Sequence, residues 1–189
     1  MKADPQAQRL LLDLQGIDTA LAQLAHRRAT LPELAEVERL TRQVSELEDE
    51  RVRAQVDVDD LDRNIARLER DIEQVRARKE RDSARLASGR GPARELEALQ
   101  HEIASLNRRQ SDLEDAELEL MERREQAQAT LEEVEARLRS AREEKAAAEA
   151  RRDEALAAIS AEEAARADAR LPLVAQLPGD LVALYDRIR

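Results

Sequence analysis

The chain has 189 residues, of which 39% are charged and 1% aromatic, with no Phe, no Trp and a single tyrosine, Tyr185. Large side chains fill the interior of a globular domain, so this composition excludes an ordinary globular core and favours a long helix or coiled coil. The net charge of −10 argues against non-specific nucleic-acid binding by the whole surface, and the absence of cysteine excludes disulfides and thiolate metal sites within these residues.

No apolar run approaches the roughly 20 residues of a membrane span, so no membrane partner is predicted. The N-terminal sequence MKADPQAQRLLLDLQ sets acidic residues beside a short leucine run. That pattern is not typical of a signal peptide, and the expected compartment is the cytoplasm.

The first predicted helix begins at Pro5, with Asp4 before it as a cap. Its apolar stripe consists of Leu10, Leu14, Ile17, Leu21, Leu24 and Leu31, with Arg28 at one position. The phase of the stripe then slips at the sequence TLPE. Thr30 and Glu33 have the spacing of a capping box there, and Pro32 favours a first helical turn. A kink or restart of the helix is therefore predicted near Thr30–Pro32.

Two long apolar seams follow, and both advance by steps of three and four residues. The first runs from Val37 to Leu86, and the second runs from Leu96 to Ile159, more weakly beyond Ala141. The charged positions of the first seam are Arg51, Lys79 and Asp82. A stripe of this length needs a partner, so the two seams are expected to pack against each other.

The break between the seams is the sequence SGRGP. Gly89 suits the left-handed residue that ends a helix, Pro92 suits the first turn of the next helix, and Glu95 favours its N-terminus. A turn this short sends the chain back beside itself. The pairs expected across the two arms are Leu86 with Leu96, Leu68 with Leu113, Leu61 with Leu120, and Val44 with Leu138.

The predicted fold class is therefore all-α: a long antiparallel coiled-coil hairpin, kinked near Thr30–Pro32, with its tip at Ser88–Pro92 and a short C-terminal helix. Each arm is expected to span about 80 residues, or about 120 Å. Two prolines and a glycine in RLPLVAQLPGDLVALYDRIR predict that the return helix ends near Leu171. A short helix capped by Asp180 is expected next, with an apolar face of Leu181, Leu184, Tyr185 and Ile188.

The predicted organisation is a hairpin over residues 1–171, followed by a linker and short helix over residues 172–189. Within the hairpin, arm one covers 5–87, the tip 88–92 and arm two 93–171.

Charge is segregated along this hairpin. Between Arg76 and Arg94 there are seven basic and two acidic residues, a net charge of +5, whereas the stretches ELEDE and DLEDAELE are acidic. The basic residues are Arg76, Arg78, Lys79, Arg81, Arg85, Arg90 and Arg94. We expect them to form a partner-binding tip for RNA phosphates or an acidic protein face. The alternative is that they only keep the turn soluble.

No catalytic, cofactor or metal site is predicted in this chain. His26 and His101 fall at outward heptad positions, and a two-helix hairpin offers no water-limited cavity for catalysis. GRGPAR lacks the spacing and the preceding strand of a phosphate-binding glycine loop. The acidic stretches lie on helices without the loop glycine that wraps Ca²⁺, and we interpret them as solvated belts.

The stretch RELEALQHEIASLNRRQSDLEDAELELMERRE resembles a segment of the bacterial coiled-coil proteins that carry a C-terminal four-cysteine zinc ribbon. The matching positions are Glu95-Leu96, Leu99, Glu102-Ile103, Leu106, Leu113-Glu114-Asp115 and Met121-Glu122. The opening LLDLQGIDTALAQLAHRRATLPE and the closing LPGDLVALYDRIR are similar to the two ends of that family. Its members continue into two Cys-x-x-Cys pairs, so the resemblance implies a zinc ribbon after Arg189, which the residues shown do not include.

The resemblance implies a non-enzymatic adaptor or scaffold that presents its hairpin, and in the full protein a zinc ribbon, to a protein or nucleic-acid partner. An RNA-binding helical arm and a plain structural spacer are the alternatives. Hairpin factors that enter the secondary channel of RNA polymerase carry acidic residues at their tips. The basic tip SGRGPAR has the opposite sign and disfavours that class.

Overall fold

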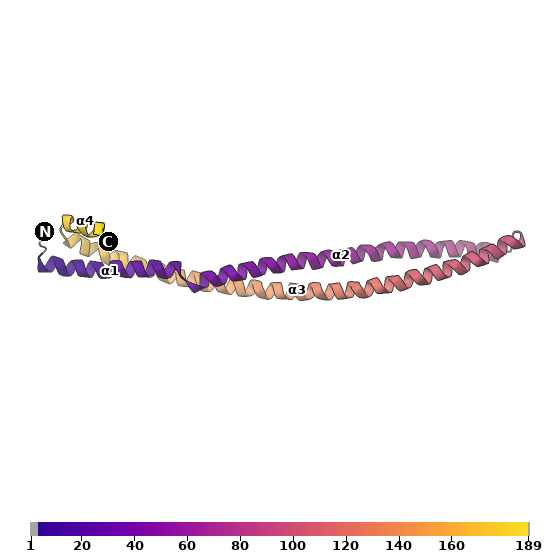
Figure 1. The fold of residues 1–189 in the computed structure, drawn as a ribbon, viewed down its shortest axis with the longest axis horizontal. Coiled ribbons are helices and arrows are strands. Elements are labelled where there is room, and N and C mark those ends of the chain that lie inside the picture. The colour runs from indigo at the N-terminus through magenta and orange to yellow at the C-terminus, as the bar shows by residue number, and fades with distance from the viewer. Residues whose placement is uncertain (1–3, 189) are drawn as a thin grey trace. The chain divides into compact units, whose positions relative to one another are not determined.

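The computed structural model describes residues 4–188, which form four α-helices and no strand. These are α1 (Pro5–Ala29), α2 (Pro32–Ala87), α3 (Ala93–Gln176) and α4 (Gly179–Ile188). Helices α2 and α3 lie side by side and antiparallel, joined at the tip (Figure 1). The predicted all-α coiled-coil hairpin is confirmed. Over the same residues, no helix combines the length and the apolar character needed to cross a membrane.

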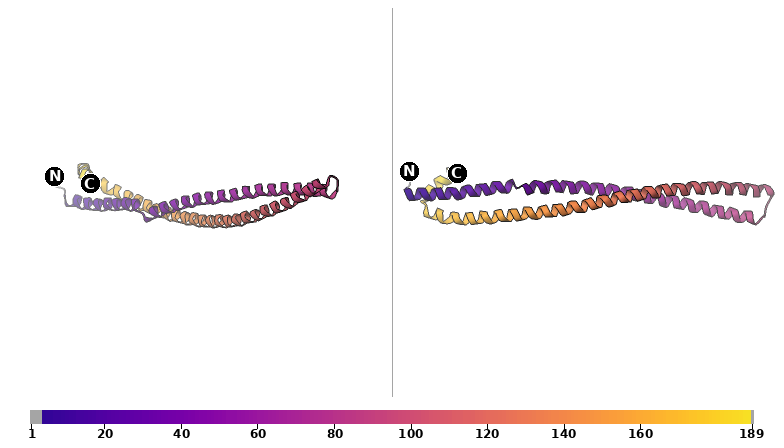
Figure 2. Two further views of the ribbon diagram at one scale, coloured as in Figure 1. Left: turned by 45° about the vertical axis from the view of Figure 1, so that its right-hand side comes forward. Right: turned by 90° about the horizontal axis from the view of Figure 1, so that it is seen from below.

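The chain forms two compact units. The distal unit, Val44–Ser140, contains the tip and the parts of α2 and α3 that flank it. Of the described residues, the basal unit contains 4–43 and 141–188. In the basal unit, α1 lies beside the C-terminal part of α3, and α4 packs near the start of α1 (Figure 2).

Both predicted features at the ends of α1 are present, but one of them has a different role. Asp4 caps α1, because its Oδ1 accepts a hydrogen bond of 2.6 Å from the backbone N–H of Gln6. The break near Thr30–Pro32 is confirmed. The predicted capping box with Glu33 is wrong, since the backbone N–H and the hydroxyl of Thr30 both donate to the carbonyl of His26. Thr30 therefore closes α1 by satisfying a terminal carbonyl, a common alternative for a Thr side chain.

The tip has the backbone conformation that its glycines permit. Gly89 has φ +61° and Gly91 has φ +133°, values that residues with a Cβ adopt only with strain. Pro92 lies immediately before α3, not inside its first turn, and its carbonyl accepts the N–H groups of Glu95 and Leu96. The predicted turn is thus confirmed at its place in the sequence.

The register of the hairpin differs from the expected one. Ala54 and Val58 of α2 form a buried cluster with Leu131 of α3. The predicted pairing of Leu61 with Leu120 would place Leu131 opposite a position about one turn before Ala54. Seam positions recur at every turn, so a shift by one turn again sets apolar residues against apolar residues. The seam alone therefore does not fix the register.

Helix α3 does not end near Leu171 as predicted, but continues to Gln176 with Pro172 inside it. Proline removes one intrahelical hydrogen bond and should disfavour this continuation. The residues beyond it are held by packing, since Leu177 is 7% exposed in a cluster with Ala7 and Leu14 of α1. Burial of these apolar side chains offsets the lost hydrogen bond.

The predicted short C-terminal helix is confirmed as α4, with two differences in detail. In its first turn, the carbonyl of Pro178 accepts hydrogen bonds from the N–H groups of Leu181 and Val182. Asp180, predicted as the cap, lies within the helix, and its carboxylate accepts a hydrogen bond from the N–H of Leu181. The side chains that pack on the α1 cluster are Leu181, Val182 and Tyr185. Ile188, expected on the apolar face, is 76% exposed.

Candidate partner-binding tip

Three of the seven predicted tip residues bind the opposite arm of the hairpin. Their shortest contacts to α3 are Arg76 to Glu114 at 2.6 Å, Arg78 to Glu102 at 2.7 Å, and Lys79 Nζ to Gln110 Oε1 at 2.6 Å. All three contacts cross between α2 and α3. These three cations therefore help to hold the arms together, and the charges of Arg76 and Arg78 are already partly neutralised by carboxylates.

The central group of this network is the carboxylate of Glu114. Gln110 Nε2 donates to it at 2.7 Å, and Arg76 Nη2 donates at 2.6 Å. These two hydrogen bonds, with Gln110 the larger cause, lower the pKa of Glu114. The same carboxylate raises the pKa of Arg76. The side chains of Arg76 and Glu114 are 48% and 38% exposed, so water screens this ion pair and it contributes little to the stability of the hairpin.

The other four residues are free to meet a partner. Arg81, Arg85, Arg90 and Arg94, which we call the distal arginines, are all exposed. Their side chains make no hydrogen bond or ion pair with any other residue between 4 and 188. Arg85 lies in the last turn of α2, Arg90 between the two tip glycines, and Arg94 in the first turn of α3.

The hairpin core ends before it reaches the distal arginines. The last buried apolar residue of α2 is Ile72, 3% exposed, and the first of α3 is Leu106, 8% exposed. Every residue between them is at least partly exposed, including Val75 and Leu86 of the seam. Local opening is easier where few apolar contacts are buried, so this end can adjust to a bound partner.

The structure adds a basic residue that the sequence analysis missed. Arg78 and Arg81 of α2 line an open groove of about 640 Å³ together with Arg109 of α3. The side chain of Arg109 is exposed and makes no hydrogen bond within the described residues. Arg109 lies outside the basic stretch Arg76–Arg94 in the sequence, but it lies across the hairpin from Arg78. Pairing the charges of both arms would have found it.

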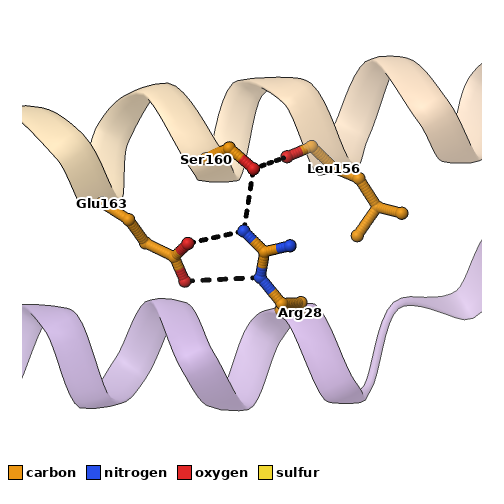
Figure 3. Close-up of polar contacts among 4 residues, drawn as sticks. All are labelled: Arg28, Leu156, Ser160 and Glu163. Atoms are coloured by element: carbon orange, nitrogen blue, oxygen red, sulfur yellow. Dashed lines mark hydrogen bonds and ion pairs between the residues drawn. The ribbon is translucent and has the colours of Figure 1, made fainter.

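Arg28 is a cation at a seam position of the basal unit, and its charge is paired with a carboxylate of α3. Its Nη2 lies 2.5 Å from Glu163 Oε2 and 2.8 Å from the hydroxyl of Ser160, which in turn donates to the carbonyl of Leu156 (Figure 3). The fork geometry matches a carboxylate. Arg28 thus fastens the last turn of α1 to α3 beside the break that precedes α2.

Arg170 joins three helices of the basal unit and was also missed. Its Nε donates to Asp18 of α1 at 3.0 Å, and its Nη2 donates to Asp186 of α4 at 2.9 Å. The hydrogen bond with Asp18 is the main cause that raises the pKa of Arg170. Asp18 is only 4% exposed although it is charged. No sequence pattern pointed to it, because Asp18 lies outside the apolar stripe.

No three His, Asp or Glu side chains converge on a point that could hold a metal ion in the part of the chain that the structure covers. His26 and His101, the two histidines, are both exposed.

Comparison with known proteins identifies the same fold in other bacteria. The family model described as the CT398-like coiled coil hairpin domain matches residues 14–189. Two Mycobacterium tuberculosis proteins, MT2288 of strain CDC 1551 and Rv2229c of strain H37Rv, are each 39% identical over 189 residues. These alignments cover 100% of this chain and 77% of each relative. ML1638 of Mycobacterium leprae is 34% identical over 118 residues, 62% of this chain and 51% of that protein.

Two solved structures are similar to the whole hairpin. A Mycobacterium smegmatis protein superimposes with a TM-score of 0.89 at 36% identity, covering 99% of this chain and 77% of its own. CT398 of Chlamydia trachomatis superimposes with a TM-score of 0.71 at 18% identity, covering 96% and 76%. The second likeness shows the fold alone. Together these matches confirm the coiled-coil part of the sequence resemblance, while the zinc ribbon stays a prediction.

Proposed function

Since the chain belongs to the family of CT398-like coiled coil hairpin domains, we propose that it is a non-enzymatic binding adaptor whose tip contacts an acidic face of a protein partner. The observation that carries the proposal is the group of four distal arginines, exposed and without a partner at the end of the hairpin. Charge-assisted hydrogen bonds from arginine suit carboxylate groups.

The charge of the chain favours a compact acidic surface over a long nucleic acid. The tip is positive, but the chain as a whole carries −10. A polyanion that extended past the tip would meet the acidic arms and be repelled. Solubility alone does not account for the arginines, because positive residues reduce the magnitude of a net charge that is already far from zero.

Reversal of the tip charge tests this function. Changing Arg85, Arg90 and Arg94 to Glu should weaken binding of a poly-glutamate peptide by about tenfold or more and reduce the salt dependence of its Kd. Affinity is measured by fluorescence anisotropy at two salt concentrations, with helix content checked by circular dichroism. A poly(U) probe is titrated in parallel.

The matched control reverses three exposed arginines of the arms whose side chains make no hydrogen bond or ion pair within residues 4–188: Arg67, Arg123 and Arg139. It changes the net charge by the same amount and should leave tip binding almost unchanged. Equal loss in both variants, or no loss in either, would show that the tip is only a turn. Binding of poly(U) without poly-glutamate would favour the RNA-binding arm instead.

The zinc ribbon is a second part of the proposal, and it rests on the family resemblance alone. We expect the native gene to continue past Arg189 into two Cys-x-x-Cys pairs. Longer family members exist, because this chain covers 77% of Rv2229c and 77% of the M. smegmatis structure. The protein expressed from the whole gene should contain about one Zn²⁺ per chain by atomic absorption. A stop codon directly after Arg189 would reject the prediction.

A further inference from the structure

The distal unit has an apolar groove well away from the tip. Leu118 and Met121 of α3 are 59% and 50% exposed, and they line an open groove of about 520 Å³ together with Ile65 of α2. We call this the mid-arm groove. The charged residues that line it are Asp62, Glu69, Glu122, Arg124 and Glu125.

The groove lies where the two-helix seam is incompletely covered. Val58 and Ile72, at the two ends of this stretch of α2, are each 3% exposed. The seam residues between them are only half-buried: Leu61, Ile65 and Leu68. In the same stretch α3 has charged residues, Glu117 and Arg124, at seam positions. Two helices therefore leave apolar surface here that a third helix could cover.

The rim of the groove has an excess of negative charge. Arg124 Nε donates to Asp62 at 3.0 Å, so the one cation of the rim is already paired. The side chains of Glu69, Glu122 and Glu125 make no hydrogen bond or ion pair with any residue that the structure describes. An apolar floor with three available carboxylates is complementary to a cationic amphipathic surface.

We propose that the mid-arm groove binds a basic amphipathic helix of a protein partner. Leucine-type side chains spaced at three and four residues would pack on Leu118 and Met121, and flanking lysines or arginines would pair with the rim. Methionine adapts its shape to such a ligand. A second copy of this groove is a poor occupant, because its carboxylates would face those of the first.

A model peptide tests the groove directly. The probe is a fluorescent helix of about 18 residues with leucine at every third or fourth position and lysine elsewhere. The double variant Leu118→Ser with Met121→Ser should weaken its binding about tenfold or more, through loss of apolar contact without a change of charge. Anisotropy measures the Kd, and the same peptide with glutamate in place of lysine should not bind.

The matched control is Val52→Ser with Val56→Ser, which removes two apolar side chains that are 51% and 48% exposed on α2 and do not line the groove. Its affinity should equal that of the wild type. Equal affinities for all three proteins would overturn the proposal, since the peptide would then sense only the net charge. Sedimentation that shows a dimer abolished by the groove variant would also overturn it, by identifying a second copy as the occupant.

Discussion

Replacement of Leu113 by aspartate should destabilise the hairpin by about 3 kcal/mol or more, because it both deletes a buried apolar side chain and buries a carboxylate. Leu113 is 6% exposed and lies on the seam of α3. Unfolding in urea, followed by the helical circular-dichroism signal, gives the change in free energy. The midpoint should fall while helix content in buffer is retained.

The matched control is Leu118→Asp, on the same helix but at a side chain that is 59% exposed. Helix propensity is then the same in both variants, and only burial differs. The free energy of unfolding should change by less than about 1 kcal/mol. Leu68→Asp should fall between the two, since Leu68 is half-buried. Similar losses at all three positions would mean that the seam does not carry the stability of the hairpin.

The sequence predicts the buried face of each helix and the place of the turn, but it does not predict the register between α2 and α3. Steps of three and four residues specify which face of each helix is buried, and Gly89 with Gly91 specifies where the chain turns. The repeat cannot specify which turn of α2 meets which turn of α3. In the structure that choice is seen in specific contacts, such as the cluster of Ala54 and Val58 with Leu131 and the hydrogen bond from Lys79 to Gln110.

At the C-terminal end, a prediction from a single residue type was wrong, because packing with a distant part of the chain outweighs the local preference of proline. Pro172 is a strong reason to end a helix, yet α3 continues through it. The reason is tertiary: Leu177, directly after α3, and Leu181 of α4 pack with Leu14, which belongs to the other end of the chain. A local rule cannot include a contact of that sequence separation.

The sequence predicted that basic residues cluster near the tip, but not which of them bind the opposite arm and which are available to a partner. Composition placed seven basic residues near the tip, but it could not separate Arg76, Arg78 and Lys79, which bind α3, from the four distal arginines. That distinction needs the register. The mid-arm groove was missed because the apolar spacing shows which face of a helix is buried but not how completely, and the seam residues Leu61, Ile65 and Leu68 are only half-buried.

Loss of the Arg170 guanidinium should destabilise the basal unit by about 3 kcal/mol, because a buried carboxylate then loses its cation. Asp18 is 4% exposed, and Arg170 Nε lies 3.0 Å from it. The effect should stay below that of a fully buried pair, since the side chain of Arg170 is 24% exposed and partly screened by water. The variant Arg170→Met keeps the apolar stem and removes the charge, so packing is largely preserved.

Two further variants separate the ion pair from other causes of instability. Arg166→Met, one turn earlier on α3, changes an exposed arginine whose side chain makes no hydrogen bond or ion pair within the described residues, and it should leave the free energy of unfolding almost unchanged. Adding Asp18→Leu to Arg170→Met should recover most of the lost stability, because no charge then remains buried at α1.

Hydrogen exchange supplies the second readout. Without the bond from Arg170 to Asp186, the amides of α4 should exchange faster, whereas those of α2 near the tip should not change. If the double variant were as unstable as Arg170→Met alone, the destabilisation would come from lost packing around the arginine stem and not from removal of the cation beside Asp18.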